Sequence, residues 1–176
     1  ELAFEVYVKS DFANTMMELL WENTKKNDGC LYGLEALGAL RVEKGHVTAA
    51  ELDGRVTIDD AGLSKMASTN KSYIGSAMRK RGVLKNNDRE ILVGFFPANL
   101  KETFNAGTIV CEKNNIKGQG IGRITSVTYS PELRHWIGIG FVKGGLDKWK
   151  DTTLVGADPV RNKQTNLKVV SPHMID

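Results

Sequence analysis

The sequence predicts an α+β fold, with helices and mixed segments first and a small antiparallel β domain after them. Apolar residues recur at helical spacing over residues 12–20 and 34–40, whereas only strand patterns follow the polar, turn-rich stretch 82–90. Because the pattern changes class across that stretch, we predict one domain over residues 1–84 and a second over residues 85–176.

The first elements are predicted to be a strand and a helix. Apolar and polar residues alternate over residues 4–8, as they do in a half-buried strand. Ser10 and Asp11 then offer a cap for the helix over residues 12–20. Gly29 suits a left-handed exit from that helix.

A second helix is predicted to lead directly into a strand. Leu34, Leu37 and Leu40 have helical spacing, but apolar and charged residues alternate over residues 40–43 before Gly45. In such a strand Arg41 and Glu43 would share one face and could form an ion pair or reach a ligand. This pattern therefore predicts a short helix followed by an extended segment.

The segment over residues 51–60 is polar and acidic, and we expect it to run over the surface. Its carboxylates lack the ligand spacing and the closing glutamate of a calcium loop. A solvated loop that touches a partner subunit is the better interpretation. Apolar structure restarts over residues 61–68, and a helix is predicted over residues 72–80.

The second half of the chain contains six short runs rich in β-branched and aromatic residues. Paired asparagines at 114–115 and paired glycines at 144–145 predict tight turns. Strands of this length and spacing predict a small barrel or sandwich. The predicted strands are Ile91 to Phe96, Thr108 to Glu112, Gly122 to Tyr129, Ile137 to Val142, Thr152 to Gly156 and Leu167 to Val170.

Composition narrows the functional classes. The 176 residues are 41% hydrophobic and 26% charged, and no apolar run approaches the ~20 residues that cross a bilayer, so we expect a cytoplasmic protein. The net charge is +3, with the excess of basic residues after residue 84. Charges and aromatics are not interleaved as in a nucleic-acid groove. An anionic small ligand or an acidic partner subunit fits the basic half as well as a solvated surface does.

Two other patterns predict no site. The glycine-rich run 118–122 precedes a strand and not a helix, so it does not match a dinucleotide-binding loop. His46, His135 and His173 stand alone without metal-ligand spacing, so we predict no metal site.

Several motifs, in register along nearly the whole chain, resemble the folate-binding aminomethyltransferase family that includes the T-protein of glycine cleavage. The run GLEALGALRVEKGH resembles most the branch of this family formed by alpha subunits of heterotetrameric sarcosine oxidases. The other matching runs are ELAFEVY at 1–7, AGL at 61–63, SYIG at 72–75, GRITSVTYSP at 122–131 and IGIGFV at 137–142.

The resemblance implies the second half of a folate-binding aminomethyltransferase-like α+β domain, followed by a small antiparallel β-barrel domain. In the family the signature that matches residues 1–7 lies midway along the folate module. The resemblance therefore implies that this sequence corresponds to the later part of a longer protein. The catalytic aspartate of the family lies upstream of that signature, and no residue here is expected to take its role.

Glu5 and Arg41 are the candidate cofactor-binding residues. By its position in the run at 1–7, Glu5 resembles the family's acid that binds the pterin of tetrahydrofolate. A carboxylate suits this role because it can accept two parallel hydrogen bonds from a pterin. An exposed strand glutamate is the alternative. The folate-binding arginine of the family is replaced by Leu37, and His46 replaces a family tyrosine. Arg41 could therefore be a folate contact or a structural ion-pair residue.

As a sarcosine oxidase-like chain, this module would use tetrahydrofolate to capture the imine from sarcosine oxidation as 5,10-methylenetetrahydrofolate. The resemblance implies FAD, FMN and NAD elsewhere in the complex, and as partners the beta, gamma and delta subunits and the missing amino-terminal part. Two alternatives stay open. The chain could belong to an aminomethyltransferase or dimethylglycine oxidase, or it could be a non-catalytic module that docks other subunits.

Overall fold

The computed structural model describes residues 2–86, 88–116 and 118–175, and its chain forms two compact units. The first unit spans Glu1–Leu34 and the second Glu35–Asp176. We describe each unit by itself. The domain boundary predicted between residues 84 and 85 stays a prediction.

The first unit contains one long helix. The 3-10 helix η1 (Ser10–Phe12) leads into α1 (Ala13–Lys26), which has Asn27 as its C-cap and so ends shortly before Gly29, as predicted. Asp28 takes the left-handed conformation at φ 54°, the role expected of Gly29. Neither η1 nor α1 has a side-chain cap hydrogen bond, so the predicted capping by Ser10 or Asp11 is wrong.

The predicted strand over residues 4–8 is also wrong. Residues 2–9 have no regular secondary structure, and their large apolar side chains are exposed. A strand is stabilised by hydrogen bonds to neighbouring strands, and no described strand pairs with this segment. Alternation alone therefore does not form a sheet here.

Helix α2 (Leu34–Glu43) continues through the segment that was predicted to be extended. Four alternating residues fit either period, and the helix continues to a Schellman ending at Gly45. Gly45 has φ 69°, its N–H donates to Val42 O over 3.1 Å, and the N–H of His46 donates to Arg41 O over 2.8 Å. Arg41 and Glu43 therefore project in different directions around a helix and do not share a strand face.

Short helical turns follow α2. They are η2 (Ser64–Met66), α3 (Ser76–Arg79) and η3 (Gly82–Lys85). The helix predicted over 72–80 is thus shortened to a single turn, because Gly75 adopts φ 92° immediately before it.

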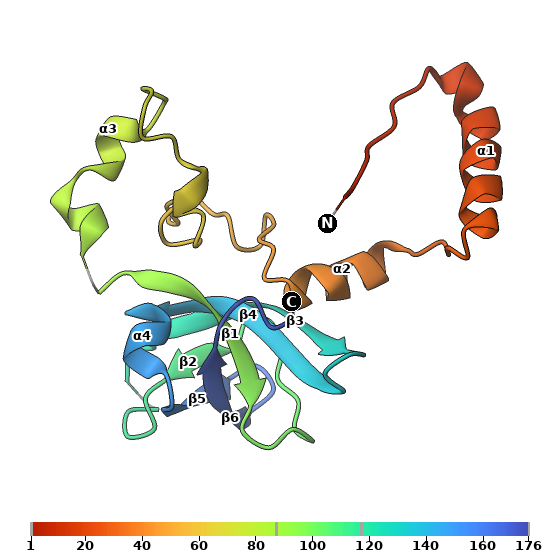
Figure 1. The fold of residues 1–176 in the computed structure, drawn as a ribbon. Coiled ribbons are helices and arrows are strands. Elements are labelled where there is room, and N and C mark those ends of the chain that lie inside the picture. The colour runs from red at the N-terminus through yellow and green to blue at the C-terminus, as the bar shows by residue number, and fades with distance from the viewer. Residues whose placement is uncertain (1, 87, 117, 176) are drawn as a thin grey trace. The chain divides into compact units, whose positions relative to one another are not determined.

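The strands that follow η3 close into an antiparallel barrel in the order β1-β4-β3-β2-β5-β6 (Figure 1). All six predicted strands are present, and the prediction of a barrel is confirmed over a sandwich. The glycines at 144–145 do not form a tight turn between strands, however, because both have positive φ and introduce helix α4 (Gly145–Trp149). The strands are β1 (Glu90–Pro97), β2 (Ile109–Cys111), β3 (Gly122–Ser130), β4 (His135–Lys143), β5 (Thr153–Asp158) and β6 (Lys163–Val170).

Two apolar clusters stabilise the second unit. One includes Val93, Phe95, Ile124 and Leu167 from the barrel strands. The other joins Val42 of α2 to Leu92, Ile137, Ile139 and Phe141 of β1 and β4. The carboxyl end of α2 is therefore fixed to the barrel by burial of apolar side chains.

Candidate functional site

Glu5, the predicted pterin ligand, lies in the extended segment of the first unit. Its side chain is exposed, and its Oε2 accepts a short hydrogen bond from the hydroxyl of Tyr7. This hydrogen bond raises the pKa of Tyr7, because ionising the phenol would place a second negative charge beside the carboxylate. The carboxylate keeps accepting capacity for a ligand.

Arg41, the second predicted ligand, binds a buried carboxylate in the second unit. Its Nη1 lies 3.2 Å from Glu51 Oε2, and its Nη2 donates to Ser126 Oγ over 2.7 Å. Ser126 Oγ donates in turn to Glu51 Oε1 over 2.6 Å. A register shift of β3 between Ile124 and Ser126 lies at this contact. The sequence allowed Arg41 two possible roles, a folate contact or a structural ion pair, and these contacts have the geometry of the second.

Glu51 has an exposed fraction of 0% in spite of its polar neighbourhood. The N–H and hydroxyl of Thr48 also donate to its Oε2, over 2.9 and 3.1 Å. Burial raises the pKa of Glu51, but hydrogen bonds, beginning with that from Ser126, and the charge of Arg41 outweigh it and hold the pKa below its usual value. The carboxylate is therefore held ionised by its partners.

Asp60 repeats this arrangement nine residues later. It is buried, accepts hydrogen bonds from the N–H of Thr57 over 2.8 Å and from Arg89 Nε over 2.8 Å, and pairs with Arg89 Nη2 as well. Burial raises the pKa of Asp60, but its hydrogen bonds, beginning with those from Arg89, outweigh this effect and hold the pKa below its usual value. The prediction that residues 51–60 form a solvated loop is therefore wrong at both ends, because each terminal carboxylate is buried against an arginine.

A sequence signal for these two carboxylates was available. Thr48 precedes Glu51 by three residues and Thr57 precedes Asp60 by three, the spacing of a capping box. The backbone N–H of Asp60 also donates to Thr57 Oγ1 over 3.2 Å, which completes the reciprocal pair. The arginines that neutralise the carboxylates could not be found in this way, because they lie outside the motif.

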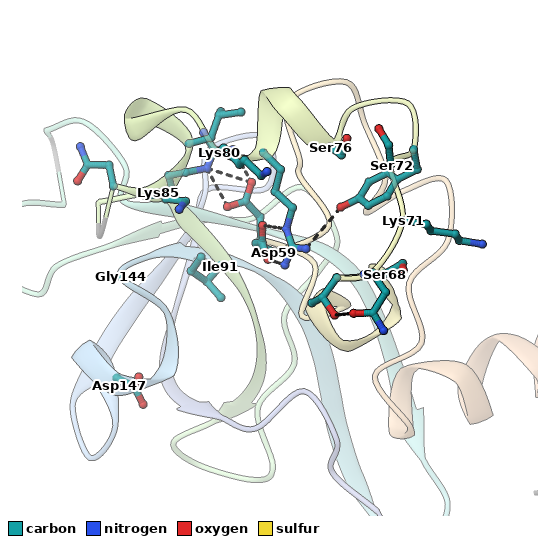
Figure 2. Close-up of a pocket in the computed structure, with 18 of the residues that line it drawn as sticks. Asp59, Ser68, Lys71, Ser72, Ser76, Lys80, Lys85, Ile91, Gly144 and Asp147 are labelled. Atoms are coloured by element: carbon teal, nitrogen blue, oxygen red, sulfur yellow. Dashed lines mark hydrogen bonds and ion pairs between the residues drawn. The ribbon is translucent and has the colours of Figure 1, made fainter.

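A broad cleft opens beside the second pair (Figure 2). Its volume is about 1250 Å³, and its walls come from the segment 59–91 and from the α4 region. Within it Arg79 Nε and Nη2 donate to the two oxygens of Asp59 over 2.7 and 2.5 Å. These hydrogen bonds lower the pKa of Asp59 to about 2. Asp59 and Asp60 are thus both neutralised by arginines inside the cleft.

Two further features bear on function. Among residues 2–86, 88–116 and 118–175, no group of three or more His, Cys, Asp or Glu side chains could hold a metal ion. No helix in the described part of the chain has both the length and the apolar character needed to cross a membrane.

Comparison with known proteins identifies the two parts of the chain. Residues 1–71 match the GCVT N-terminal domain, and residues 91–176 match the glycine cleavage T-protein C-terminal barrel domain. Glu5 and Arg41 lie in the first match, whereas Ser126 lies in the second.

Curated relatives include two kinds of enzyme. The chain is 31% identical over its whole length to the sarcosine oxidase subunit alpha of Rhizobium meliloti (strain 1021), of which it spans 18%. It is 30% identical, over 84% of its length, to the mitochondrial aminomethyltransferase of Flaveria anomala, of which it spans 36%. The chain therefore spans less than two fifths of these relatives.

A solved structure has the same fold. It is the glycine cleavage system aminomethyltransferase T from Bartonella henselae, with a TM-score of 0.75 and 21% identity, over 92% of this chain and 44% of that one. The predicted order of an aminomethyltransferase-like α+β segment and an antiparallel barrel is confirmed. The chain belongs to the glycine cleavage T-protein (GCVT) family.

Proposed function

We propose that the chain is part of a tetrahydrofolate-binding module of a sarcosine oxidase alpha-type protein. In this proposal the module captures the one-carbon unit from sarcosine oxidation as 5,10-methylenetetrahydrofolate. The likeness to a sarcosine oxidase subunit alpha along the whole chain supports the assignment, as does the family match that contains Glu5.

The observation that carries the proposal is the exposed carboxylate of Glu5. A pterin offers an N3–H and an exocyclic amino group side by side, which match the two oxygens of one carboxylate. Glu5 has only the Tyr7 hydroxyl as a hydrogen-bond partner among the described residues. A pterin would compete with that hydroxyl for Oε2, and Oε1 would accept the second hydrogen bond.

Arg41 remains our second candidate for a folate contact. Its side chain is 21% exposed, and both terminal nitrogens donate within the cluster of Glu51 and Ser126. We propose that its main contribution to binding is to hold the end of α2 in place.

The chemistry assigned to these residues is positioning. Holding a folate nitrogen against an imine removes much of the entropic barrier without a covalent intermediate on the protein. None of the described residues is assigned the role of the family's catalytic aspartate, so we expect this stretch by itself to bind without turnover. FAD, FMN and NAD would act elsewhere in a complex with beta, gamma and delta subunits.

An aminomethyltransferase is the second candidate, favoured by the 30% identity to the Flaveria anomala enzyme. Leu37 stands where that branch of the family is expected to have an arginine. Flavin-bearing subunits copurifying with the protein would favour the sarcosine oxidase assignment over this one.

Calorimetric titration with tetrahydrofolate tests the proposal. We expect Glu5→Gln to weaken binding by about tenfold, or ~1.4 kcal/mol, because an amide presents only one acceptor to the two pterin donors. Glu22→Gln removes an exposed charge from α1 of the same unit and should leave affinity unchanged. The titration is made with the intact protein in which the chain occurs. Equal affinity of wild type and Glu5→Gln would remove Glu5 from the site.

A further inference from the structure

The cleft of the second unit has a charge excess that the proposed function does not use. Six basic and three acidic side chains line it. Two of the acids, Asp59 and Asp60, are already neutralised by Arg79 and Arg89. The remaining lining charges are four lysines, Lys71, Lys80, Lys85 and Lys148, and one carboxylate, Asp147.

None of these four lysines forms an ion pair with another described residue. All four side chains are exposed. They come from separate segments, because Lys71 precedes α3, Lys80 follows it, Lys85 ends η3 and Lys148 lies in α4. Figure 2 shows Lys71 on the side of the view opposite Gly144 and Asp147, with Lys80 and Lys85 nearer to Gly144. The uncompensated charge is therefore distributed along the cleft.

The neutral lining residues add hydrogen-bonding groups. The polar ones offer hydroxyls and two amides, and Leu84, Ile91 and Gly144 complete the neutral lining; the polar residues are Ser68, Thr69, Asn70, Ser72, Tyr73, Ser76 and Asn86. A peptide backbone needs such donors and acceptors when it leaves water. The cleft therefore combines dispersed positive charge with groups suited to a polypeptide.

The available cations favour an extended anion over a compact phosphate. Arginine is the side chain that binds phosphate through two parallel hydrogen bonds, and both arginines of the cleft are occupied by aspartates. A compact phosphate would contact only part of a lysine set that is spread over several elements. The volume, about 1250 Å³, also exceeds the ~300–1,000 Å³ of ordinary small-molecule pockets.

We propose that this cleft is a docking site for an acidic peptide segment of a partner protein. Carboxylates along an extended segment would pair with the four lysines, and the hydroxyl-rich wall would hydrogen bond to the peptide backbone. Asp59 and Asp60 stay ionised near neutral pH, and their charges stay paired with those of Arg79 and Arg89. The charge that the cleft offers to a peptide therefore comes from the four lysines and Asp147. The proposal does not depend on folate binding.

Fluorescence anisotropy with a labelled hexaglutamate peptide tests the site. We expect the triple variant Lys80→Gln, Lys85→Gln, Lys148→Gln to bind the peptide about tenfold or more weakly, because three attractive charges are lost. The control triple Lys101→Gln, Lys113→Gln, Lys168→Gln has the same net charge but alters exposed lysines outside the cleft, and we expect less than about a twofold effect.

A variant of opposite sign makes the test independent of folding defects. Asp147→Asn removes the one unpaired carboxylate of the cleft and should strengthen binding by about two- to threefold. Glu112→Gln, an exposed change outside the cleft, should not. Equal weakening by the two lysine triples, no gain with Asp147→Asn, or no peptide binding by the wild type would each overturn the proposal. Binding of tripolyphosphate in preference to the peptide would also overturn it.

Discussion

Glu51 shows how one side chain can decide the local structure of a polar segment. Its carboxylate accepts hydrogen bonds from Arg41, Ser126 and Thr48 and has no exposed surface. Removing one partner of such a pair leaves the other charge poorly solvated, which costs more than the net strength of the pair. Glu51 therefore connects α2, the following loop and β3.

At this scale we predict that Glu51→Ala lowers the free energy of unfolding by about 3 kcal/mol, because Arg41 and Ser126 lose their buried acceptor. Glu51→Gln keeps an acceptor and should cost less. Urea unfolding followed by circular dichroism measures both effects. Glu35→Ala, an exposed change at the start of α2, serves as the control and should stay within about 0.5 kcal/mol of wild type. A similar small effect for Glu51→Ala would show that the cluster contributes little.

Helix α2 shows what ends a helix in this chain. Gly45 combines a left-handed φ of 69° with close packing, since a Cβ there would lie 2.5 Å from the carbonyl oxygen of Pro172. The carboxyl-terminal segment also contacts the helix end through the N–H of Met174, which donates to Glu43 O over 3.0 Å. Gly45 is thus required both by backbone conformation and by the segment that covers it.

At the scale of this element, glycine substitutions should have opposite effects at two positions. Gly45→Ala is expected to destabilise the chain by about 1–3 kcal/mol, because alanine is strained at this φ and collides with Pro172. Gly38 lies inside α2, and a Cβ added there would have no neighbouring atom within 4 Å. Gly38→Ala should therefore stabilise the helix by up to about 1 kcal/mol. Thermal unfolding of the two variants compares them directly. Destabilisation by both would contradict the assignment of α2 as a regular helix at Gly38.

At the scale of the whole chain, burial is concentrated in the second unit. No described residue of 2–34 is buried, whereas the barrel strands contain Phe95, Ile139, Phe141 and Leu167, all with exposed fractions of 0%. A 14-residue helix without a buried face has marginal stability in water. The two units should therefore differ in local stability.

Hydrogen exchange measures this difference. We expect amides of α1 to exchange at close to the rate of an unfolded peptide, and amides of β4 to be protected to the limit set by global unfolding. The comparison uses peptides from both segments of one exchange experiment, so each serves as the reference for the other. Protection of α1 equal to that of β4 would mean that its apolar residues are buried in solution.

The sequence alone determined the features that depend on neighbouring residues. The six barrel strands and the end of α1 shortly before Gly29 follow from periodicity and turn chemistry over a few positions. The motifs that resemble the aminomethyltransferase family placed Glu5 and Arg41 as candidates, and their role in folate binding stays a prediction.

Only the tertiary structure decided the state of residues 40–43, the start of α4 and the burial of Glu51 and Asp60. The partners responsible are distant in sequence: Ser126 lies 75 residues from Glu51, and Arg89 lies 29 residues from Asp60. Local patterns show that a residue is polar, but not whether a distant cation or hydroxyl will replace its water. For a carboxylate, that replacement is the physical difference between an exposed loop and a buried cluster.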